Sequence, residues 1–278
     1  MRKGAESYIM SACKRYDLAE EQIKAFSRSG VRAKTMLCLK DGPKTAADLE
    51  SLIGTRSSTI LHSIKAMRDE HLIKKTDCGY ALTNIGNIQA LLLNDLVDCI
   101  ITLGEHKDFW LSHEIGCIPV ELQKDIGVLM HSEIISPDQA NIFRCHEHYL
   151  ERLRQANEIY GVSPITAPGY SEAIRQAVER GAEVELVITG DVLEIVSQRN
   201  PDLAATLLKF DNFRLYRLND RVKVAFTVTD SILSLSFYRF DGSYDIDRDL
   251  IGSSEDARAW GMRLFEHYRQ MAEPVRMP

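Results

Sequence analysis

The sequence predicts a multidomain α+β protein with an N-terminal winged helix-turn-helix, a long connecting helix and a C-terminal α/β sheet domain. Two short amphipathic helices, a glycine-containing turn between them and a hairpin after them indicate the first part. An apolar stripe at helical spacing indicates the second. Strand-like segments that alternate with helical ones indicate the third, because this alternation is typical of helices packed on a sheet. We therefore divide the chain into residues 1–83, 84–114 and 115–278.

The composition is that of an ordinary globular protein. Hydrophobic residues make up 45% and charged residues 27% of the 278 positions, as is usual for soluble domains. No run of about 18 apolar residues is long enough to span a membrane, and the first ten residues lack the apolar core of a signal peptide. We expect a cytoplasmic protein that has no membrane partner.

The cysteines and histidines do not predict a metal site or a cofactor. The six cysteines are scattered without a C-x-x-C pair, so we expect reduced thiols. Cys145-His146-Glu147-His148 resembles a metal motif, but on a helix its two histidines, at positions i and i+2, face different ways. Glycine-rich phosphate loops of the common types are absent from the sequence.

Charge is distributed unevenly along the chain. The net charge is −6, yet residues 1–95 carry 15 basic against 11 acidic side chains and the remainder carries 19 against 29. An acidic body repels a phosphate backbone and leaves contact with it to the basic end. This asymmetry supports a nucleic-acid partner for the N-terminal part.

The N-terminal part has the signals of a helix-turn-helix. Residues 18–38 have the spacing of one helix. A second helix is predicted to start at Thr45 as N-cap, with Asp48 in its first turn, and to end at Gly54. The third is predicted over residues 56–70. Its buried stripe consists of Ile60, Ile64 and Met67, with Leu61 beside them.

The exposed face and first turn of this third helix carry hydrogen-bond donors and cations: Arg56, Ser57, Ser58, Thr59, His62 and Lys65. Donors at the start of a helix suit the major groove of DNA, which is about 12 Å wide. The alternative is a solvated helix in an ordinary helical domain. The hairpin that follows favours DNA binding, because helix, turn, helix and hairpin form the winged-helix order.

That hairpin is the predicted wing. Its strands cover residues 72–75 and 80–82, with Gly79 where the turn needs positive φ. Lys74, Lys75 and Tyr80 are placed to contact backbone phosphates or the minor groove. An ordinary exposed hairpin without such a role is the alternative.

A long helix is predicted after Thr83, which can cap it. Its apolar positions recur every three or four residues: Ile85, Ile88, Leu92, Leu96, Ile100 and Leu103, widened by Leu91, Leu93, Val97 and Ile101. This is more apolar surface than a lone surface helix needs. The helix packs either against the chain's own core or against a second copy, and we favour a homodimer because DNA readers of this kind usually work as pairs.

The C-terminal part has α/β alternation. We predict helices at residues 137–160, 171–180, 192–198, 201–209 and from Ser253 or Ser254 to Met271. We predict strands at residues 162–166, 184–189, 213–218, 223–229 and 231–240. The acidic stretch at residues 244–249 is predicted to be a solvated loop.

Two segments resemble known archaeal proteins. GPKTAADLESLIGTRSSTILHSIKAMRDEHLIKKTDCGYALTNIG resembles the winged helix-turn-helix of archaeal, ArsR-like transcriptional regulators. IYGVSPITAPGY, GAEVELVIT and KVAFTVTDSILSLSFYRFDG resemble the C-terminal domain of methanogenesis-regulator-type proteins. The resemblance implies a sensor-like domain behind a DNA-binding head.

The C-terminal domain is also distantly similar to half of a phospholipase D fold. The enzyme motif H-x-K-x-x-x-x-D has its best-spaced counterpart in Lys223–Asp230, where lysine replaces the nucleophilic histidine and Ala225 replaces the lysine. A protonated lysine cannot attack phosphorus. The resemblance therefore implies that the chemistry has been lost and that no catalytic residue remains, although a sheet crevice is kept.

Six residues are predicted to line that crevice by alternation and position: Arg217, Arg221, Lys223, Ser234, Ser236 and Tyr238. Ligands of open α/β sheets bind beyond the carboxyl ends of the strands. Three cations and three hydroxyls suit a small anionic ligand. Alternatively, these side chains discourage aggregation at a sheet edge.

The sequence thus predicts a sequence-specific, homodimeric, DNA-binding transcriptional regulator whose C-terminal domain senses a small ligand or mediates assembly. Its main partner is double-stranded DNA. Two alternatives remain: a phosphoester-processing enzyme with a helical accessory domain, and an interaction module whose winged helix binds protein.

Overall fold

The chain divides into two compact units, residues 1–96 and 97–278. The computed structural model describes residues 11–27 and 29–276. The boundary lies inside one helix, α5 (Asn84–Glu105), so this helix belongs to both units. Helix α5 ends at Glu105, whereas the sequence predicts a connecting segment that extends to residue 114.

The N-terminal unit has the winged helix-turn-helix order. Its elements are α1 (Ala12–Ser27), α2 (Gly30–Lys40), α3 (Ala46–Ile53), α4 (Ser57–Asp69), β1 (Ile73–Thr76), β2 (Gly79–Leu82) and the first half of α5. The prediction of a single helix over residues 18–38 was wrong. Ser29 caps a new helix, its Oγ accepting from the Arg32 amide at 3.4 Å, and residue 28 lies outside the described residues.

Local capping fixes the helix-turn-helix. The Thr45 Oγ1 accepts a hydrogen bond from the Asp48 amide at 3.2 Å, and the Asp48 carboxylate accepts one from the Thr45 amide at 2.8 Å. This reciprocal pair satisfies donors that the first turn of α3 leaves free. Gly54 ends α3 in the left-handed region with φ 71°. The predicted cap residues are therefore confirmed.

One apolar cluster joins α2, α3, α4, the hairpin and the start of α5. Its buried members are Met36, Leu39, Leu49, Ile60, Ile64, Met67, Leu72, Ile73 and Ala90. Helix α5 approaches the chain so closely at Gly86 that a Cβ there would lie 2.1 Å from the Leu72 carbonyl oxygen. Only glycine permits this approach without a shift of backbone.

The C-terminal unit is a mixed sheet with helices on both faces. The helical elements are α6 (Lys107–Ser112), η1 (Ile115–Cys117), α7 (Val120–Lys124), η2 (Ile126–Leu129), α8 (Arg144–Gln155), α9 (Tyr170–Arg180), α10 (Gly190–Arg199), α11 (Leu203–Leu207) and α12 (Glu255–Met271). The strands are β3 (Glu133–Ile135), β4 (Glu158–Ser163), β5 (Glu183–Thr189), β6 (Phe213–Leu218), β7 (Val224–Thr229), β8 (Leu233–Phe237), β9 (Asp249–Gly252) and β10 (Glu273–Pro274).

The sheet order within the described residues is β10-β6-β5-β4-β7-β8-β9-β3. Strands β4, β5 and β6 are parallel, whereas β7 is antiparallel to β4, and β8, β9 and β3 continue antiparallel. The chain therefore changes at β7 from βαβ crossovers to connections that contain no helix. That change leaves strands β7 to β9 without crossover helices of their own.

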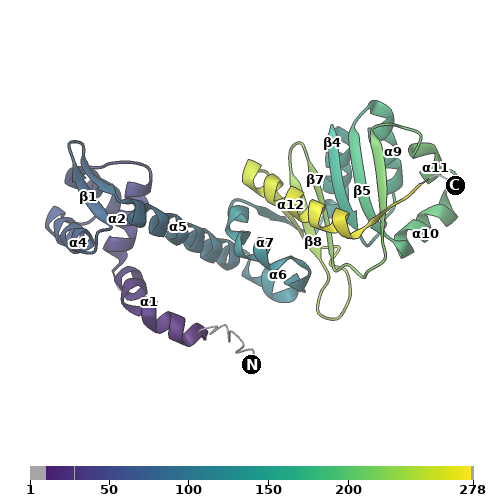
Figure 1. Cartoon of the computed structure of the whole chain (residues 1–278). Coiled ribbons are helices and arrows are strands. Elements are labelled where there is room, and N and C mark those ends of the chain that lie inside the picture. Colours follow the sequence, from purple (N-terminus) through teal and green to yellow (C-terminus); the bar gives the residue numbers. More distant parts are fainter. Residues whose placement is uncertain (1–10, 28, 277–278) are drawn as a thin grey trace, which may run out of the picture. The chain divides into compact units, whose positions relative to one another are not determined.

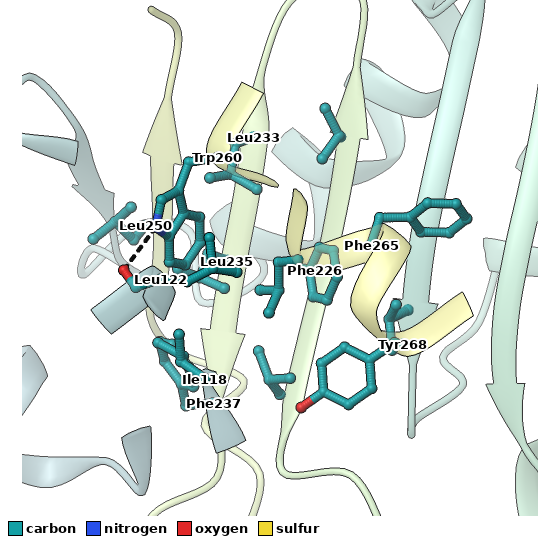
Figure 2. Packing of buried hydrophobic residues seen from close by; sticks show 14 of the residues in the cluster. Ile118, Leu122, Phe226, Leu233, Leu235, Phe237, Leu250, Trp260, Phe265 and Tyr268 are labelled. Carbon is teal, nitrogen blue, oxygen red and sulfur yellow. Dashed lines mark hydrogen bonds between the residues drawn. The ribbon is translucent and has the colours of Figure 1, made fainter. Parts of the chain in front are cut away.

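The two faces of the sheet have separate apolar cores. Helix α12 crosses one face (Figure 1), and its Trp260, Leu264 and Phe265 pack with residues of β7 and β8. The Trp260 indole also donates to the Leu122 carbonyl at 3.0 Å (Figure 2). Helices α8, α9, α10 and α11 cover the β4–β6 part of the opposite face around Ile159, Val184 and Leu215.

Several predicted boundaries in this unit were wrong. The helix predicted over residues 137–160 is only α8, because Ile159 is buried inside strand β4 and Tyr160 points to the other side of the sheet. The acidic stretch at residues 244–249 is no solvated loop. Asp245 and Asp249 are buried, and Asp249 begins β9.

The two glycines of α5 give a matched test of the Leu72 contact. We expect Gly86→Ala to lower the free energy of unfolding by about 1–3 kcal/mol, because the new methyl overlaps the Leu72 carbonyl. Gly104→Ala, with nothing within 4 Å of the new Cβ, should instead raise it by up to about 1 kcal/mol through helix propensity. Urea unfolding of both variants checks this. Equal effects would show that α5 does not pack on Leu72.

Candidate functional site

The outer face of α4 is solvent-exposed and carries polar and basic side chains, with the 42% exposed Leu61 among them. Ser58, His62 and Lys65 are all exposed and are spaced i, i+4 and i+7, so they share one side of the helix. The buried Ile60 and Ile64 lie on the opposite side. This surface is held in place by apolar packing beneath it.

The predicted DNA-contacting residues of α4 do not all share that face. Arg56 is exposed at the N-cap without a side-chain cap bond. Ser57 donates its hydroxyl to the Glu50 carboxylate of α3, which ties the two helices across the turn. Thr59 and His62 both line a groove with Val31 of α2 and Gln89 of α5, so His62 borders this groove as well as the outer face. Arg56, Ser58, His62 and Lys65 thus form the outward set.

The hairpin presents its two lysines separately. Lys74 and Lys75 are exposed neighbours on β1, and successive strand residues point to opposite faces. Tyr80 is half-buried and packs on the N-terminal core. Its backbone pairs with Lys44 through bonds of 2.8 and 3.0 Å, so Lys44 joins the wing as a cation that the sequence pattern did not identify.

The C-terminal unit contains a cavity of about 510 Å³ on the sheet face opposite α12. Its floor comes from β7, β8 and β9, and one wall comes from α8. The residues that line it are Ile142, Phe143, Cys145, His146, Tyr149, Val162, Ser163, Ile165, Ala167, Pro168, Tyr170, Ala225, Phe226, Thr227, Ser234, Ser236 and Tyr244–Asp249. We call it the β7–β9 cavity.

A buried carboxyl group lies in the floor of this cavity. Asp249 is 6% exposed. Its two oxygens accept hydrogen bonds from the Ser234 hydroxyl at 2.7 Å and the Ser236 hydroxyl at 2.9 Å. Burial raises the pKa of Asp249 to about 6, although the serines oppose the shift. Within residues 11–27 and 29–276, no cationic side chain pairs with it.

A second buried aspartate organises the loop that borders the cavity. The Asp245 carboxylate is 2.9 Å from the His113 Nε2, 2.7 Å from an Arg239 nitrogen and 2.7 Å from an Arg248 nitrogen. Burial raises the pKa of Asp245, but hydrogen bonds from the Asp247 amide and Arg248 outweigh burial and hold it below its ordinary value. The cationic charge of Arg248 is therefore engaged by Asp245.

Aromatic side chains form the wall opposite this loop. The Tyr149 hydroxyl lies 2.8 Å from the Thr227 Oγ1. The Tyr170 ring is 5.0 Å from the Tyr149 ring and stacks on His146 at 5.4 Å, measured between centroids. Beside them, burial raises the pKa of the Cys145 thiol to about 11, so the thiol stays protonated at neutral pH.

The four residues of the motif Cys145–His148 do not all face the same site. Cys145 and His146 line the β7–β9 cavity, whereas Glu147 and His148 are not among its lining residues. In the described part of the chain, no three metal-ligating side chains gather into a group that could hold an ion.

The six residues predicted to line one ligand crevice are dispersed. Ser234 and Ser236 line the β7–β9 cavity, and Arg217, Arg221, Lys223 and Tyr238 do not. Lys223 instead pairs with Glu114 at 2.5 Å, and Arg217 lies near Gly190 at the start of α10. Ser234 and Ser236 contact Asp249 and not the predicted cations, because β8 pairs with β9. The register of that pairing cannot be predicted from one sequence.

The phospholipase D-like motif likewise lacks an arrangement for catalysis. Lys223, in the position of the nucleophilic histidine, is bound to Glu114, and Ala225 carries no functional group. Asp230 accepts hydrogen bonds from the amide and side chain of Asn157 at 3.1 and 3.2 Å. These contacts give the aspartate a structural role.

The raised pKa of Asp249 predicts a pH-dependent stability. The folded protein keeps this proton to higher pH than the unfolded chain, so the stabilisation present below about pH 4 is lost as the pH rises through about 6. The amide introduced by Asp249→Asn could not ionise. We therefore expect this variant to be the more stable protein, by an amount that grows by about 1–1.5 kcal/mol between pH 5 and pH 8.

Urea unfolding of both proteins at the two pH values measures this difference. Asp211→Asn is the control, since Asp211 is exposed and exposed substitutions usually change stability by less than about 0.5 kcal/mol. A pH-independent difference for Asp249→Asn would contradict the buried, uncompensated carboxylate.

Two solved structures resemble parts of the chain. TrmBL2, an archaeal chromatin protein that shows a novel mode of DNA binding, is 16% identical with a TM-score of 0.43, covering 95% of this chain and 100% of its own. Nuc, a phospholipase D family member from Salmonella typhimurium, is 13% identical with a TM-score of 0.41, covering 52% of this chain and 98% of its own. Both TM-scores lie below 0.5, so these likenesses alone establish nothing about the chain.

Sequence similarity is more specific. The chain is 36% identical over 260 residues to the methanogenesis regulatory protein FilR1 of Methanothrix harundinacea (strain 6Ac), which covers 92% of this chain but 58% of that relative. The FilR1 N-terminal domain family matches residues 20–101, and the FilR1 middle domain family matches residues 142–271. The chain therefore carries the N-terminal and middle domains of the FilR1 family.

Proposed function

We propose that this protein is a transcriptional regulator that binds double-stranded DNA through α4 and the wing. The observation that carries the proposal is the outer face of α4, where Ser58, His62 and Lys65 are exposed behind Arg56 while apolar packing holds the helix beneath them. The methanogenesis regulatory protein to which the chain is related supports a regulatory role. Because the chain matches 58% of that relative, the proposal concerns the two shared domains.

The chemistry of this surface suits a duplex. Arg56 and Lys65 can reach guanine edges or phosphates in the major groove, and Ser58 and His62 between them can bond to base edges or sugar-phosphate oxygens. Lys74 and Lys75, exposed on the wing, add phosphate contacts. The acidic remainder of the chain favours approach by this end.

We also propose that a second copy of the chain covers an apolar stripe on α5. The α5 stripe consists of the exposed residues Ile85, Ile88, Leu92, Leu96 and Ile100. It contains no charged residue, and contiguous exposed apolar surface marks an interaction site. A second copy offers the same stripe, so the contact is self-complementary about a two-fold axis.

Helix α5 is also long and apolar enough, by length and composition, to cross a membrane. Its two halves argue for a protein partner. Ala90 is fully buried in the N-terminal core, and Thr102 is fully buried in the C-terminal unit, where its hydroxyl donates to the Asp98 carbonyl at 2.9 Å and lies 3.3 Å from that of Gly127. Removing the helix into lipid would expose both cores.

The C-terminal domain is proposed to bind a small ligand and pass its occupancy to α5. The cavity loop is tied to the end of α6, because Arg248 donates to the Ser112 hydroxyl at 2.9 Å and Asp245 holds His113. Helix α6 begins at Lys107, two residues after α5 ends. A ligand that prefers one arrangement of this loop would bias α5 by that preference.

DNA binding by α4 can be tested with single charge removals in the full chain. Arg56→Ala and Lys65→Ala should each weaken binding to DNA from the promoter of its own gene. A lost base contact costs about 1–3 kcal/mol of affinity, whereas a lost phosphate contact lowers the salt slope by about one. Fluorescence anisotropy at several salt concentrations separates the two outcomes.

Lys209→Ala is the matched control, since it removes an exposed cation from the C-terminal unit and should leave affinity unchanged. If both α4 variants bound the promoter as the wild type does, the DNA-binding surface would lie elsewhere.

The dimer is tested by charges in the α5 stripe. Leu92→Glu combined with Leu96→Glu should give a folded monomer with weaker promoter binding, because unpaired charges in an apolar seam are strongly destabilising. Leu111→Glu is the control: Leu111 is 66% exposed against 64% for Leu92, but it lies outside the stripe. Light scattering gives the mass, and a persistent dimer in the double variant would refute this interface.

A further inference from the structure

The β7–β9 cavity combines an aromatic wall with an apolar rim. Five aromatic side chains face it: Phe143, His146, Tyr149, Tyr170 and Tyr244. At its margin, Ile142 is 69%, Phe143 62% and Ile246 72% exposed. Large apolar side chains that stand in water beside a concave site are typical of binding sites.

The charges of the lining are acidic. Asp245, Asp247 and Asp249 line the cavity, and Arg248 is the cation among its lining residues. Arg248 is engaged by Asp245, and Asp247 lies 3.6 Å from Arg239. The charge that the described residues leave without a cationic partner is that of Asp249, at the floor. Such a lining repels carboxylates and phosphates.

We propose that the β7–β9 cavity binds a small organic cation, an amine or quaternary ammonium with apolar substituents, whose charge lies against Asp249 and the tyrosine rings. The aromatic faces attract a desolvated ammonium, because the face of each ring carries a negative potential. The apolar substituents lie against Ile142, Phe143 and Ile246. This inference names the ligand of the proposed sensor domain, and it rests on that proposed function only for its effect on DNA.

Asp249 is arranged to receive such a charge. Each of its oxygens accepts one serine hydroxyl, and a carboxylate offers about four acceptor positions in all. A buried carboxylate without a cation is unfavourable, and a partner charge removes that penalty only when the remaining hydrogen bonds are satisfied. The two serines fill two of these positions, so a ligand has to supply the charge and can contact the positions that remain.

The size of the space agrees with a small molecule. The cavity volume of about 510 Å³ lies within the range of about 300–1,000 Å³ that is usual for ligand sites. A second, apolar space of about 100 Å³ shares Tyr149, Tyr170 and Thr227 with it. Rotation of either tyrosine would extend the site toward the core beneath α9 and α10.

The test compares three probes of nearly the same shape on the full chain: choline, its neutral isostere 3,3-dimethylbutanol and the anion 3,3-dimethylbutyrate. We expect choline to bind in calorimetry and to raise the Tm. The neutral isostere should bind at least tenfold more weakly, and the anion should not bind. Equal binding of choline and the neutral isostere, or preferential binding of the anion, would overturn the proposal.

Variants locate the site. Asp249→Asn should weaken choline binding at least tenfold, and Tyr170→Leu, which removes one ring of the wall, should weaken it several-fold. Arg221→Ala, which alters an exposed residue outside the lining, should bind choline as the wild type does. Unchanged binding by both Asp249→Asn and Tyr170→Leu would refute the site.

The readouts for ligand and DNA are independent. Choline binding is measured without DNA, and promoter binding is measured without choline. Absence of DNA binding would contradict the proposed function without affecting the cation site. Absence of choline binding would contradict the cation site without affecting the proposed DNA-binding function.

Discussion

Alternation along strand β8 organises the C-terminal domain. Leu233, Leu235 and Phe237 point into the core under α12, while Ser234 and Ser236 point to the other face. This period of two is imposed by the pleat. On the α12 side it yields a closed apolar core. On the other side α8 stands as a wall beside β7–β9, so the same alternation produces the polar floor of a cavity.

That floor explains the unusual position of the acidic stretch. Asp249 is buried because β9 pairs with β8 beside the two serines, and Asp245 is buried because His113, Arg239 and Arg248 surround it. One carboxylate is compensated by cations of the chain and the other is not. An apolar residue in place of Asp249 would be at least as favourable for stability. The presence of an uncompensated buried carboxylate therefore favours a binding role.

The N-terminal unit depends on a different constraint, the close packing of a short domain. Reciprocal caps fix α3, and Gly86 lets α5 approach the chain at Leu72. With its inner sides occupied by Ala90 and Thr102, α5 still leaves an apolar stripe exposed. The helix that links the two units is thus also the surface we propose for dimerisation.

The sequence alone determined the features that depend on local periodicity and on single-residue signals. The capping of α3, the buried stripe of α4, the hairpin at Gly79, and the strands and helices from residue 170 to 218 could all be predicted, because each rests on neighbours within a few residues. Strands β3, β9 and β10 could not, because they are equally short and none is joined to its partner strand by a tight turn like the one at Gly79 between β1 and β2.

The tertiary structure decided which side chains line the proposed ligand site. Ser234 and Ser236 were identified from alternation, but their partner Asp249 lies 13 to 15 residues away in a stretch that looks like a solvated acidic loop. Tyr149 and Tyr170 come from helices on another part of the chain. Pairing of distant strands, and not local propensity, brings these side chains together, and one sequence carries no record of register between strands.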